Sequence, residues 1–305
     1  MPKNTVDFGD WVKSHVDKLR KSIDKVKNID PRVVYGPKGE WMVAKLLVLG
    51  FWVDLYTRIF GKQIKLGNFG SIYFIDLLAG AGLCSVQREG HAEADIVAGS
   101  SVVAATYCYV PFTKYILVEK KMSMAAALEA RMKVLDPNVE VIVDDCNNSI
   151  NRVVSNFGRK DHYLAFVDNQ GCDAKWSTIQ TLIQHHGDVW ITFQTSEVAR
   201  TVETGAYREF LGLDQHETSP PDPLSYYVRK LEAAGRLVKV IHVPGIGGFS
   251  YDLILATRRT PAGSPWLDSL DKLKENVERL DISFIRSTLE QLAGRQTNLR
   301  SFTHD

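Results

Sequence analysis

Residues 71–82 read SIYFIDLLAGAG, and they carry most of what the sequence says about architecture and function. The apolar and aromatic first part, which follows Gly70, has the length and composition of a strand buried on both faces in a parallel sheet. Gly80 and Gly82 then flank a single alanine, so the backbone can turn tightly and approach a ligand without an intervening Cβ atom. A buried strand that ends in such a turn is typical of the first loop of a nucleotide-binding α/β protein.

Asp76 makes this loop more specific. It lies four residues before Gly80, where a carboxylate repels a pyrophosphate but suits a hydroxyl or a cationic amine. The third glycine of the dinucleotide pattern is absent, because Ser85 stands three residues after Gly82. The pattern Asp-Leu-x-Ala-Gly-x-Gly resembles the first motif of S-adenosylmethionine-dependent methyltransferases with a Rossmann-like fold. The resemblance implies S-adenosylmethionine as cofactor, held by Asp76, Ala79, Gly80 and Gly82; the alternative is a tight turn in another kind of α/β protein.

A second predicted strand, residues 113–119, ends in Glu119. A carboxylate at the end of the strand after the glycine loop can accept hydrogen bonds from both ribose hydroxyls of a nucleoside-containing cofactor. We therefore predict that Glu119 binds the cofactor, the alternative being a surface residue at a strand end. Residues 83–99 make the separation from Gly82 larger than the ~20 residues of the dinucleotide pattern, and we expect them to form a solvated loop.

A third predicted strand, residues 139–143, leads into Asp145, Cys146 and Asn147. In methyltransferases, which the sequence resembles, a polar side chain at this point commonly reads the adenine edge, because the exocyclic amine needs an acceptor. Asp145 and Asn147 are the candidates, with Cys146 beside them in the predicted cofactor site. The alternative is that the aspartates here cap a helix over residues 149–157.

The fourth predicted strand, residues 162–168, ends in Asp168 and Asn169. This end should face the glycine loop across the topological switch, where ligands of open α/β sheets bind. We predict that Asp168 and Asn169 are catalytic and that the methyl acceptor is held near them. Asp168 can orient or deprotonate the acceptor, while positioning provides most of the rate; the mechanism requires no metal.

The order of elements indicates the fold class. Five strands alternate with helices, and a further helix then precedes a hairpin of two antiparallel strands, as in the class I methyltransferase core. We predict a Rossmann-like α/β fold with a mostly parallel seven-stranded sheet, an antiparallel terminal hairpin, and helices at both chain ends. Residues 33–39 read as a turn-rich link. The expected units are an N-terminal helical extension, a core with an inserted segment near 196–222, and C-terminal helices, with bounds 1–62, 63–260 and 261–305.

Bulk composition is that of an ordinary globular protein, with 45% apolar and 24% charged residues in a chain of 305. Lys plus Arg is 37 and Asp plus Glu is 36, so no global field favours nucleic acid or an anionic membrane.

The four cysteines are far apart, so neither a zinc knuckle nor a disulfide framework is indicated. With no segment of signal-peptide or membrane-spanning type, we expect a cytoplasmic protein that does not bind membranes.

At family level the sequence resembles the three-Cys-motif partner proteins, TcmP, over roughly residues 8–260. The matching segments are residues 73–82, 99–101, 118–120, 145–147 and 165–171, followed by Trp176. The resemblance implies a methyltransferase-like fold and a role beside a radical-type partner enzyme, which is the protein that carries the cysteine triplet. The family usually has Asp-Pro-Phe-Gly where this chain has Asp-Asn-Gln-Gly at residues 168–171, so the resemblance does not extend to a platform for stacking a planar substrate.

These observations predict an S-adenosylmethionine-dependent methyltransferase of undefined acceptor that works with a partner protein, a three-Cys-motif protein being the candidate. One alternative is a methyltransferase-like scaffold without turnover, which the altered loop at 168–171 favours. A second alternative is a nucleic-acid base methyltransferase. Global charge does not indicate nucleic acid, but a local basic cluster leaves that partner open: Arg200, Arg208, Arg229, Lys230 and Arg236.

Overall fold

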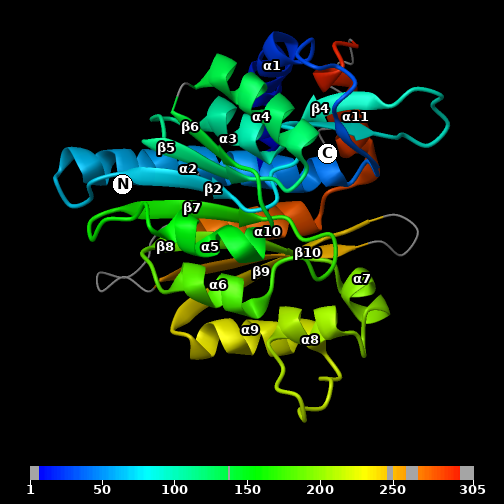
Figure 1. Ribbon diagram of the computed structural model, residues 1–305. Helices are drawn as coiled ribbons and strands as arrows, with labels where there is room; N and C mark the ends of the chain where they lie inside the picture. Colours follow the sequence, from blue (N-terminus) through cyan, green and yellow to red (C-terminus); the bar gives the residue numbers. More distant parts are fainter. Residues whose placement is uncertain (1–6, 137, 246–249, 259–266, 296–305) are drawn as a thin grey trace.

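The computed structural model describes residues 7–136, 138–245, 250–258 and 267–295. Figure 1 shows a central β-sheet with helices on both faces. Within the described residues the sheet has seven strands, in the order β6 (Val139–Ile142), β5 (Lys114–Val118), β2 (Ile72–Asp76), β7 (His162–Val167), β8 (Gly187–Phe193), β10 (Tyr251–Arg258) and β9 (Arg236–Val243). Strand β2, whose sequence predicted a strand buried on both faces, lies inside the sheet between β5 and β7.

Strand direction confirms the predicted fold class. The strands from β6 to β8 are parallel to their neighbours, whereas β10 runs antiparallel to both β8 and β9. The chain fills one side of β2 with β5 and β6, then crosses to the other side with β7 and β8. The direction of winding therefore changes at β2, and its carboxyl end is the switch point at which such sheets bind ligands.

Two layers of apolar side chains cover the faces of the sheet. On one face Phe74 and Phe166 belong to a core shared with α1 (Phe8–Val26), α2 (Met42–Lys65), α3 (Ser100–Tyr107), α4 (Met122–Leu135), α10 (Leu267–Glu278) and α11 (Ile282–Leu292). On the other face Ile75 and Val167 pack with α5 (Cys146–Val154), α6 (Trp176–Ile183), α8 (Gly205–Leu211) and α9 (Pro223–Ala233). Side chains alternate between the two layers because successive strand residues point to opposite faces.

A smaller sheet departs from the sequence-based expectation. Strand β3 (Leu83–Val86) leaves the glycine loop directly and pairs antiparallel with β4 (Asp95–Ala98), and β1 (Tyr35–Lys38) adds to it in parallel. The solvated loop expected over 83–99 is therefore a hairpin, and the link expected over 33–39 contains a strand. Buried Leu83, Val86 and Val97 stabilise this sheet, since they join the core beneath it.

The inserted segment near 196–222 is built from α7 (Thr195–Arg200), α8 and connecting loops. Its aromatic residues Tyr207 and Phe210 are fully buried, and the Phe210 ring stacks on Tyr227 with centroids 5.1 Å apart. These contacts hold the segment against helix α9. Because the rings of Tyr207 and Phe210 are buried there, they are not available to stack on a planar substrate.

Several expectations fall on residues outside the described ranges. These are part of the connection within the predicted hairpin, residues 246–249, and residues 261–266 and 296–305 of the predicted C-terminal unit. Among the helices of the described residues, none combines the length and the apolar character that crossing a bilayer requires.

Candidate functional site

A cavity of about 310 Å³ lies at the carboxyl ends of β2, β5, β6 and β7, where the switch point predicts a ligand. Its wall includes six of the residues predicted from the sequence: Ala79, Gly80, Glu119, Asp145, Cys146 and Asp168. The smaller sheet and helix α2 supply much of the rest of the wall, including Tyr35, Lys38, Met42, Lys45 and Cys84. Its size is at the lower end of the range of small-molecule sites, about 300–1,000 Å³.

Glu119 is tied to the glycine loop. Its carboxylate accepts a hydrogen bond from Gly80 N at 3.0 Å and another from Lys121 N at 2.8 Å. Gly80 has φ of +61°, a left-handed conformation in which the absent Cβ allows the loop to turn beneath the cavity. The side chain is 8% exposed and lies at the cavity wall, so main-chain donors fix its orientation toward the space a ligand would enter.

Arg131 holds the same loop from behind. Its fully buried guanidinium donates to Ala81 O at 2.6 Å and to main-chain oxygens of Ile29, Asp30 and Val33, which precede strand β1. The glycine loop and the segment leading to β1 are therefore held by one side chain from helix α4.

Asp76 lies beneath the loop, outside the cavity wall. It is fully buried, and its carboxylate accepts hydrogen bonds from Leu78 N at 3.2 Å, from Ser101 Oγ at 3.4 Å and, at short range, from Ser100 Oγ. Burial raises the pKa of Asp76 to about 7, against the lowering effect of the Ser100 hydrogen bond. Direct contact of Asp76 with a cofactor, which the sequence predicted, stays a prediction; the observed contacts fix the start of helix α3.

Residues 145–147 divide between two roles. Asp145 caps helix α5 by accepting from Asn147 N at 2.9 Å, which is the alternative that the sequence left open, and it also lines the cavity. The Asn147 side chain points away, because its amide oxygen accepts from Lys175 N and Thr178 Oγ1. Cys146 lines the cavity in a nearly dry position, and burial raises the pKa of its thiol to about 12.

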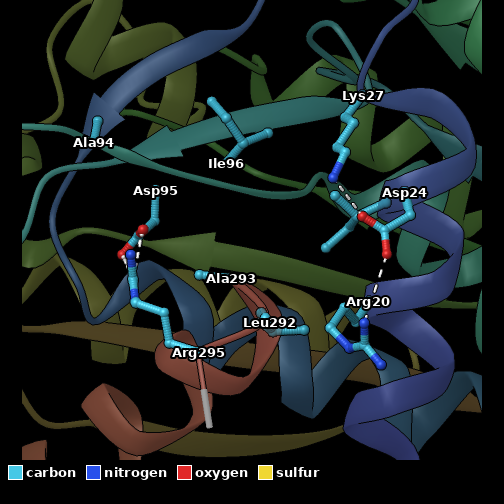
Figure 2. A pocket seen from close by; sticks show the side chains of 11 residues that line it. Arg20, Asp24, Lys27, Ala94, Asp95, Ile96, Leu292, Ala293 and Arg295 are labelled. Carbon is cyan, nitrogen blue, oxygen red and sulfur yellow. Dashed lines mark hydrogen bonds and ion pairs between the residues drawn. The ribbon is translucent and has the colours of Figure 1, made fainter.

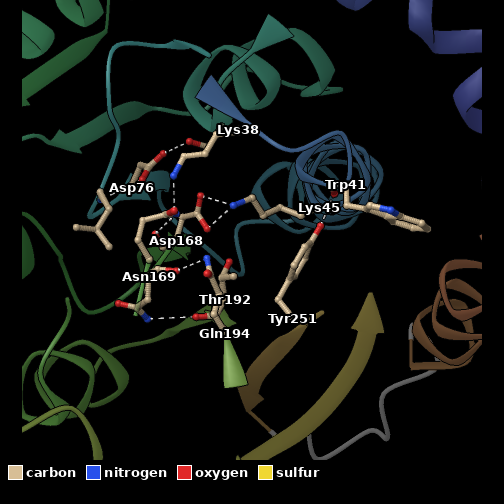
Figure 3. A network of polar contacts seen from close by, with 12 residues as sticks. Lys38, Trp41, Lys45, Asp76, Asp168, Asn169, Thr192, Gln194 and Tyr251 are labelled. Carbon is tan, nitrogen blue, oxygen red and sulfur yellow. Dashed lines mark hydrogen bonds and ion pairs between the residues drawn. The ribbon is translucent and has the colours of Figure 1, made fainter. Parts of the chain in front are cut away.

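Asp168 is held by Lys45 of helix α2, as Figure 3 shows. Lys45 Nζ lies 2.6 Å from one carboxylate oxygen and 2.5 Å from the other, and the two side chains are 6% and 19% exposed. A lysine within the apolar helix α2 thereby gains a partner that compensates its burial. Asp168 reaches the cavity with both oxygens already paired to the ammonium group.

Asn169, the second predicted catalytic residue, is fully buried and is not part of the cavity wall. Its side-chain oxygen accepts from Ala174 N at 3.0 Å, and its amide nitrogen donates to Thr192 O at 3.4 Å. These bonds fold the loop that follows β7. The next residue, Gln170, faces the cavity in its place and accepts a hydrogen bond from Lys38 Nζ at 2.5 Å.

Strand β1 and helix α2 contribute to the site without having been predicted from the sequence. Lys45 carried a signal, since it is the single charged residue in the apolar first half of helix α2, residues 42–53. Lys38 and Tyr35 carried none that local pattern could reveal, because β1 reaches the site only by pairing with β3 across almost fifty residues of chain.

A second cavity, about 460 Å³, lies between α1, β4 and α11 (Figure 2). Its charged side chains pair with one another: Asp24 with Arg20 and Lys27, and Asp95 with Arg295. The Asp24 pairs lie within α1 and its C-terminal cap, and the Asp95 pair joins β4 to the last described residue, so both acids of this wall already have cationic partners.

No protein-family model matches the sequence, and no curated protein matches it. Similar solved structures include protein LPL1258 from Legionella pneumophila, with 12% identity, 74% of this chain and 88% of that chain covered, and a TM-score of 0.48. An O-methyltransferase from Bacillus cereus in complex with SAH has 12% identity, coverage of 85% and 93%, and a TM-score of 0.40. The O-methyltransferase TomG from Streptomyces achromogenes, in complex with SAM, has 13% identity, coverage of 79% and 90%, and a TM-score of 0.41.

Proposed function

We propose that the protein binds S-adenosylmethionine in the cavity at the switch point and is a methyltransferase. The observation that carries the proposal is the Glu119 carboxylate, which Gly80 N and Lys121 N hold at the wall of that cavity. A fixed carboxylate beside a glycine loop suits the two ribose hydroxyls of a nucleoside, because each hydroxyl is a donor and the carboxylate has acceptor sites left.

The cavity residues fit this cofactor along its length. Glu119 would take the ribose, the main chain at Ala79 and Gly80 would lie along its sugar, and Asp145 with Cys146 would border the adenine. The bound cofactor would supply an electrophilic methyl group on a sulfonium. The wall carries the carboxylates Glu119, Asp145 and Asp168, which suit a positively charged sulfur, beside lysines of which Lys45 is paired with Asp168.

Asp168 would position the methyl acceptor at the other side of the cavity. Lys45 fixes both of its oxygens, so Asp168 has one orientation, and remaining lone pairs could accept a hydrogen bond from the acceptor. Direct displacement gains most from such alignment, because it needs reacting atoms held in line at close range. The acceptor itself is undefined, and the proposed partner is a three-Cys-motif protein, as the TcmP resemblance implies.

A second candidate function is a scaffold that keeps the fold and the cofactor without turnover. The loop after β7 favours the scaffold, because Asp168 forms an ion pair with Lys45 and the Asn169 side chain forms hydrogen bonds with the main chain. No side chain of residues 168–169 is then free to act as a base without rearrangement.

The nucleic-acid alternative gains less support. In the basic cluster, Arg236 is 4% exposed and donates to main-chain oxygens, including Gly187 O at 2.8 Å. Lys230 donates to Leu211 O and Gly212 O, and Arg208 donates to Glu217 O. Side chains engaged in this way hold the fold together and are poorly placed to neutralise phosphates.

Calorimetric titration of the full chain with S-adenosylhomocysteine tests the proposal. We expect binding by the wild type and a loss of about tenfold to a hundredfold in Glu119→Ala, which removes charge-assisted acceptors. Glu129→Ala, on the outer side of helix α4 in an exposed pair with Lys133, is the matched control and should bind as the wild type does. Absence of binding by the wild type would refute the proposal.

Methyl transfer separates enzyme from scaffold. Labelled S-adenosylmethionine is incubated with the protein and a total cell extract, with and without a three-Cys-motif partner. Incorporation that requires the wild-type chain supports the methyltransferase. Cofactor binding together with no incorporation under either condition would favour the scaffold.

A further inference from the structure

Lys38 is a cation that the smaller sheet places in the cavity without a carboxylate partner. Its Nζ donates to the amide oxygen of Gln170 at 2.5 Å and lies 4.6 Å from the centre of the Tyr35 ring. Within the described ranges no carboxylate oxygen lies within 4.0 Å of it, whereas Lys45 nearby has Asp168. Burial lowers the pKa of Lys38, Lys45 lowers it further, and the acids Asp168 and Asp173 only partly oppose this.

An ammonium group in this position is incompletely compensated. It is half-buried, it faces a second ammonium group, and its two contacts are neutral. Such a group is stabilised when an anion enters the cavity and supplies the missing charge. The wall therefore presents an anion-binding point at Lys38.

The main chain fixes where this point lies. Strand β1 pairs with β3, Gln87 N donates to Lys38 O at 2.8 Å, and β3 begins directly after the glycine loop. A Cβ atom added at Gly80 would lie 3.6 Å from Tyr35, while Gly80 N donates to Glu119. Gly80 thus contacts the ribose residue proposed above and the strand that carries Lys38, and both charged groups border one cavity.

We propose that Lys38 binds the carboxylate at the amino-acid end of S-adenosylmethionine. This rests on the proposed function, in which Glu119 takes the ribose at the other end of the same ligand. The cofactor ends in a carboxylate and an ammonium group, and the glycine loop runs between Glu119 and strand β1. Lys38 then selects for the complete amino acid, and binding gives this lysine the charge partner that it lacks.

Two ligands that differ only in the carboxylate test the assignment: S-adenosylmethionine and decarboxylated S-adenosylmethionine. Affinities are measured by calorimetry on the full chain. The wild type should bind the complete cofactor about tenfold to a hundredfold more tightly, the range of one charge-assisted hydrogen bond. Lys38→Met should lose that preference and should bind the decarboxylated compound within about twofold of the wild type, which also shows that the variant is folded.

Two further variants sharpen the result. Lys120→Met removes a positive charge from the rim of the same cavity, next to Glu119, and should keep the preference for the carboxylate. Lys38→Arg should keep it in part, since the charge is retained. A Lys38→Met variant that keeps the preference, or weakens both ligands equally, would overturn the assignment.

The two proposals fail in different ways. If the wild type binds neither cofactor form nor 5′-methylthioadenosine, which has the nucleoside but no amino acid, the proposed function fails and this assignment with it. If all three bind and Lys38→Met changes nothing, the proposed function stands, and the unpaired cation does not serve the cofactor carboxylate.

Discussion

The carboxylates at the ends of β5 and β7 border one cavity but are held in different ways. Glu119 is held by main-chain N–H groups of its own neighbourhood, at Gly80 and Lys121. Asp168 is held by the side chain of Lys45, 123 residues away in sequence on helix α2. The first arrangement is local, and no cation of the described residues forms an ion pair with the Glu119 carboxylate. The second is a charge pair that couples the site to the N-terminal part of the chain.

Removing Lys45 should have the largest effect, because it leaves Asp168 without its only direct ion-pair partner among the described residues. We expect Lys45→Met to lower the free energy of unfolding by about 3 kcal/mol, the lower end of the range for breaking a buried pair. Guanidinium denaturation of the full chain measures it. Lys45→Met/Asp168→Asn should recover much of the loss.

The more exposed pair of Lys114 and Glu140 provides the control, with side chains 34% and 23% exposed. Lys114→Met should cost no more than about 1 kcal/mol. Equal losses in Lys45→Met and Lys114→Met would mean that the Lys45 pair is no different from a surface pair.

Asn169 should be the next most sensitive position on the β7 side. Asn169→Ala leaves Ala174 N without its side-chain acceptor in a buried loop, so we expect a loss of about 1–3 kcal/mol in unfolding free energy. Asn148→Ala, on the exposed side of helix α5, is the matched control and should change stability by less than about 0.5 kcal/mol. A stability equal to that of the wild type would mean that the Asn169 side chain does not hold this loop in place.

Asp76 gives an effect that depends on pH. Its folded pKa of about 7 lies above its ordinary value of 3.8, so its contribution to stability is complete below about pH 4 and is lost as pH rises through 7. Asp76→Asn cannot ionise and should escape this loss.

Denaturation at pH 5, 6, 7 and 8 measures the difference. The stability of Asp76→Asn relative to the wild type should rise over this range by at most about 1.4 kcal/mol per pH unit, and level off above pH 7. Burial also raises the pKa of Asp188, to about 6, but this acts in both proteins and cancels. A constant difference would mean that Asp76 does not titrate in this range.

The local sequence pattern predicted those features of the fold and the site that depend on residues close together in the sequence. The buried run before Gly80, the alternation of strands and helices and the strand-end position of Glu119 follow from periodicity and turn chemistry, and the structure has them. The smaller sheet escaped prediction because β1 and β3 are each four residues long and pair at long range. Sequence shows Asp76 as a strand-end acid, but it does not show the two serines, Ser100 and Ser101, that donate to its carboxylate.

The contacts of Asn169 and Lys45 also depend on long-range packing, which local sequence pattern does not show. Sequence places Asn169 after a strand but does not say which way its amide turns, and hydrogen bonds to Ala174 N and Thr192 O turn it inward. Lys45 was visible as an interruption of an apolar helix, yet its partner could be known only once α2 was placed against the end of β7.

Arg131 makes the first part of the described chain a structural support of the glycine turn. Its guanidinium donates hydrogen bonds to three carbonyl oxygens in residues 29–33, before β1, and to the carbonyl oxygen of Ala81. A displacement of residues 29–33 would therefore disturb the glycine turn. Shortened versions of the protein that begin after residue 35 would therefore lose more than helix α1: Arg131 would keep only the Ala81 carbonyl of these four acceptors, and β1 would lack its first residue.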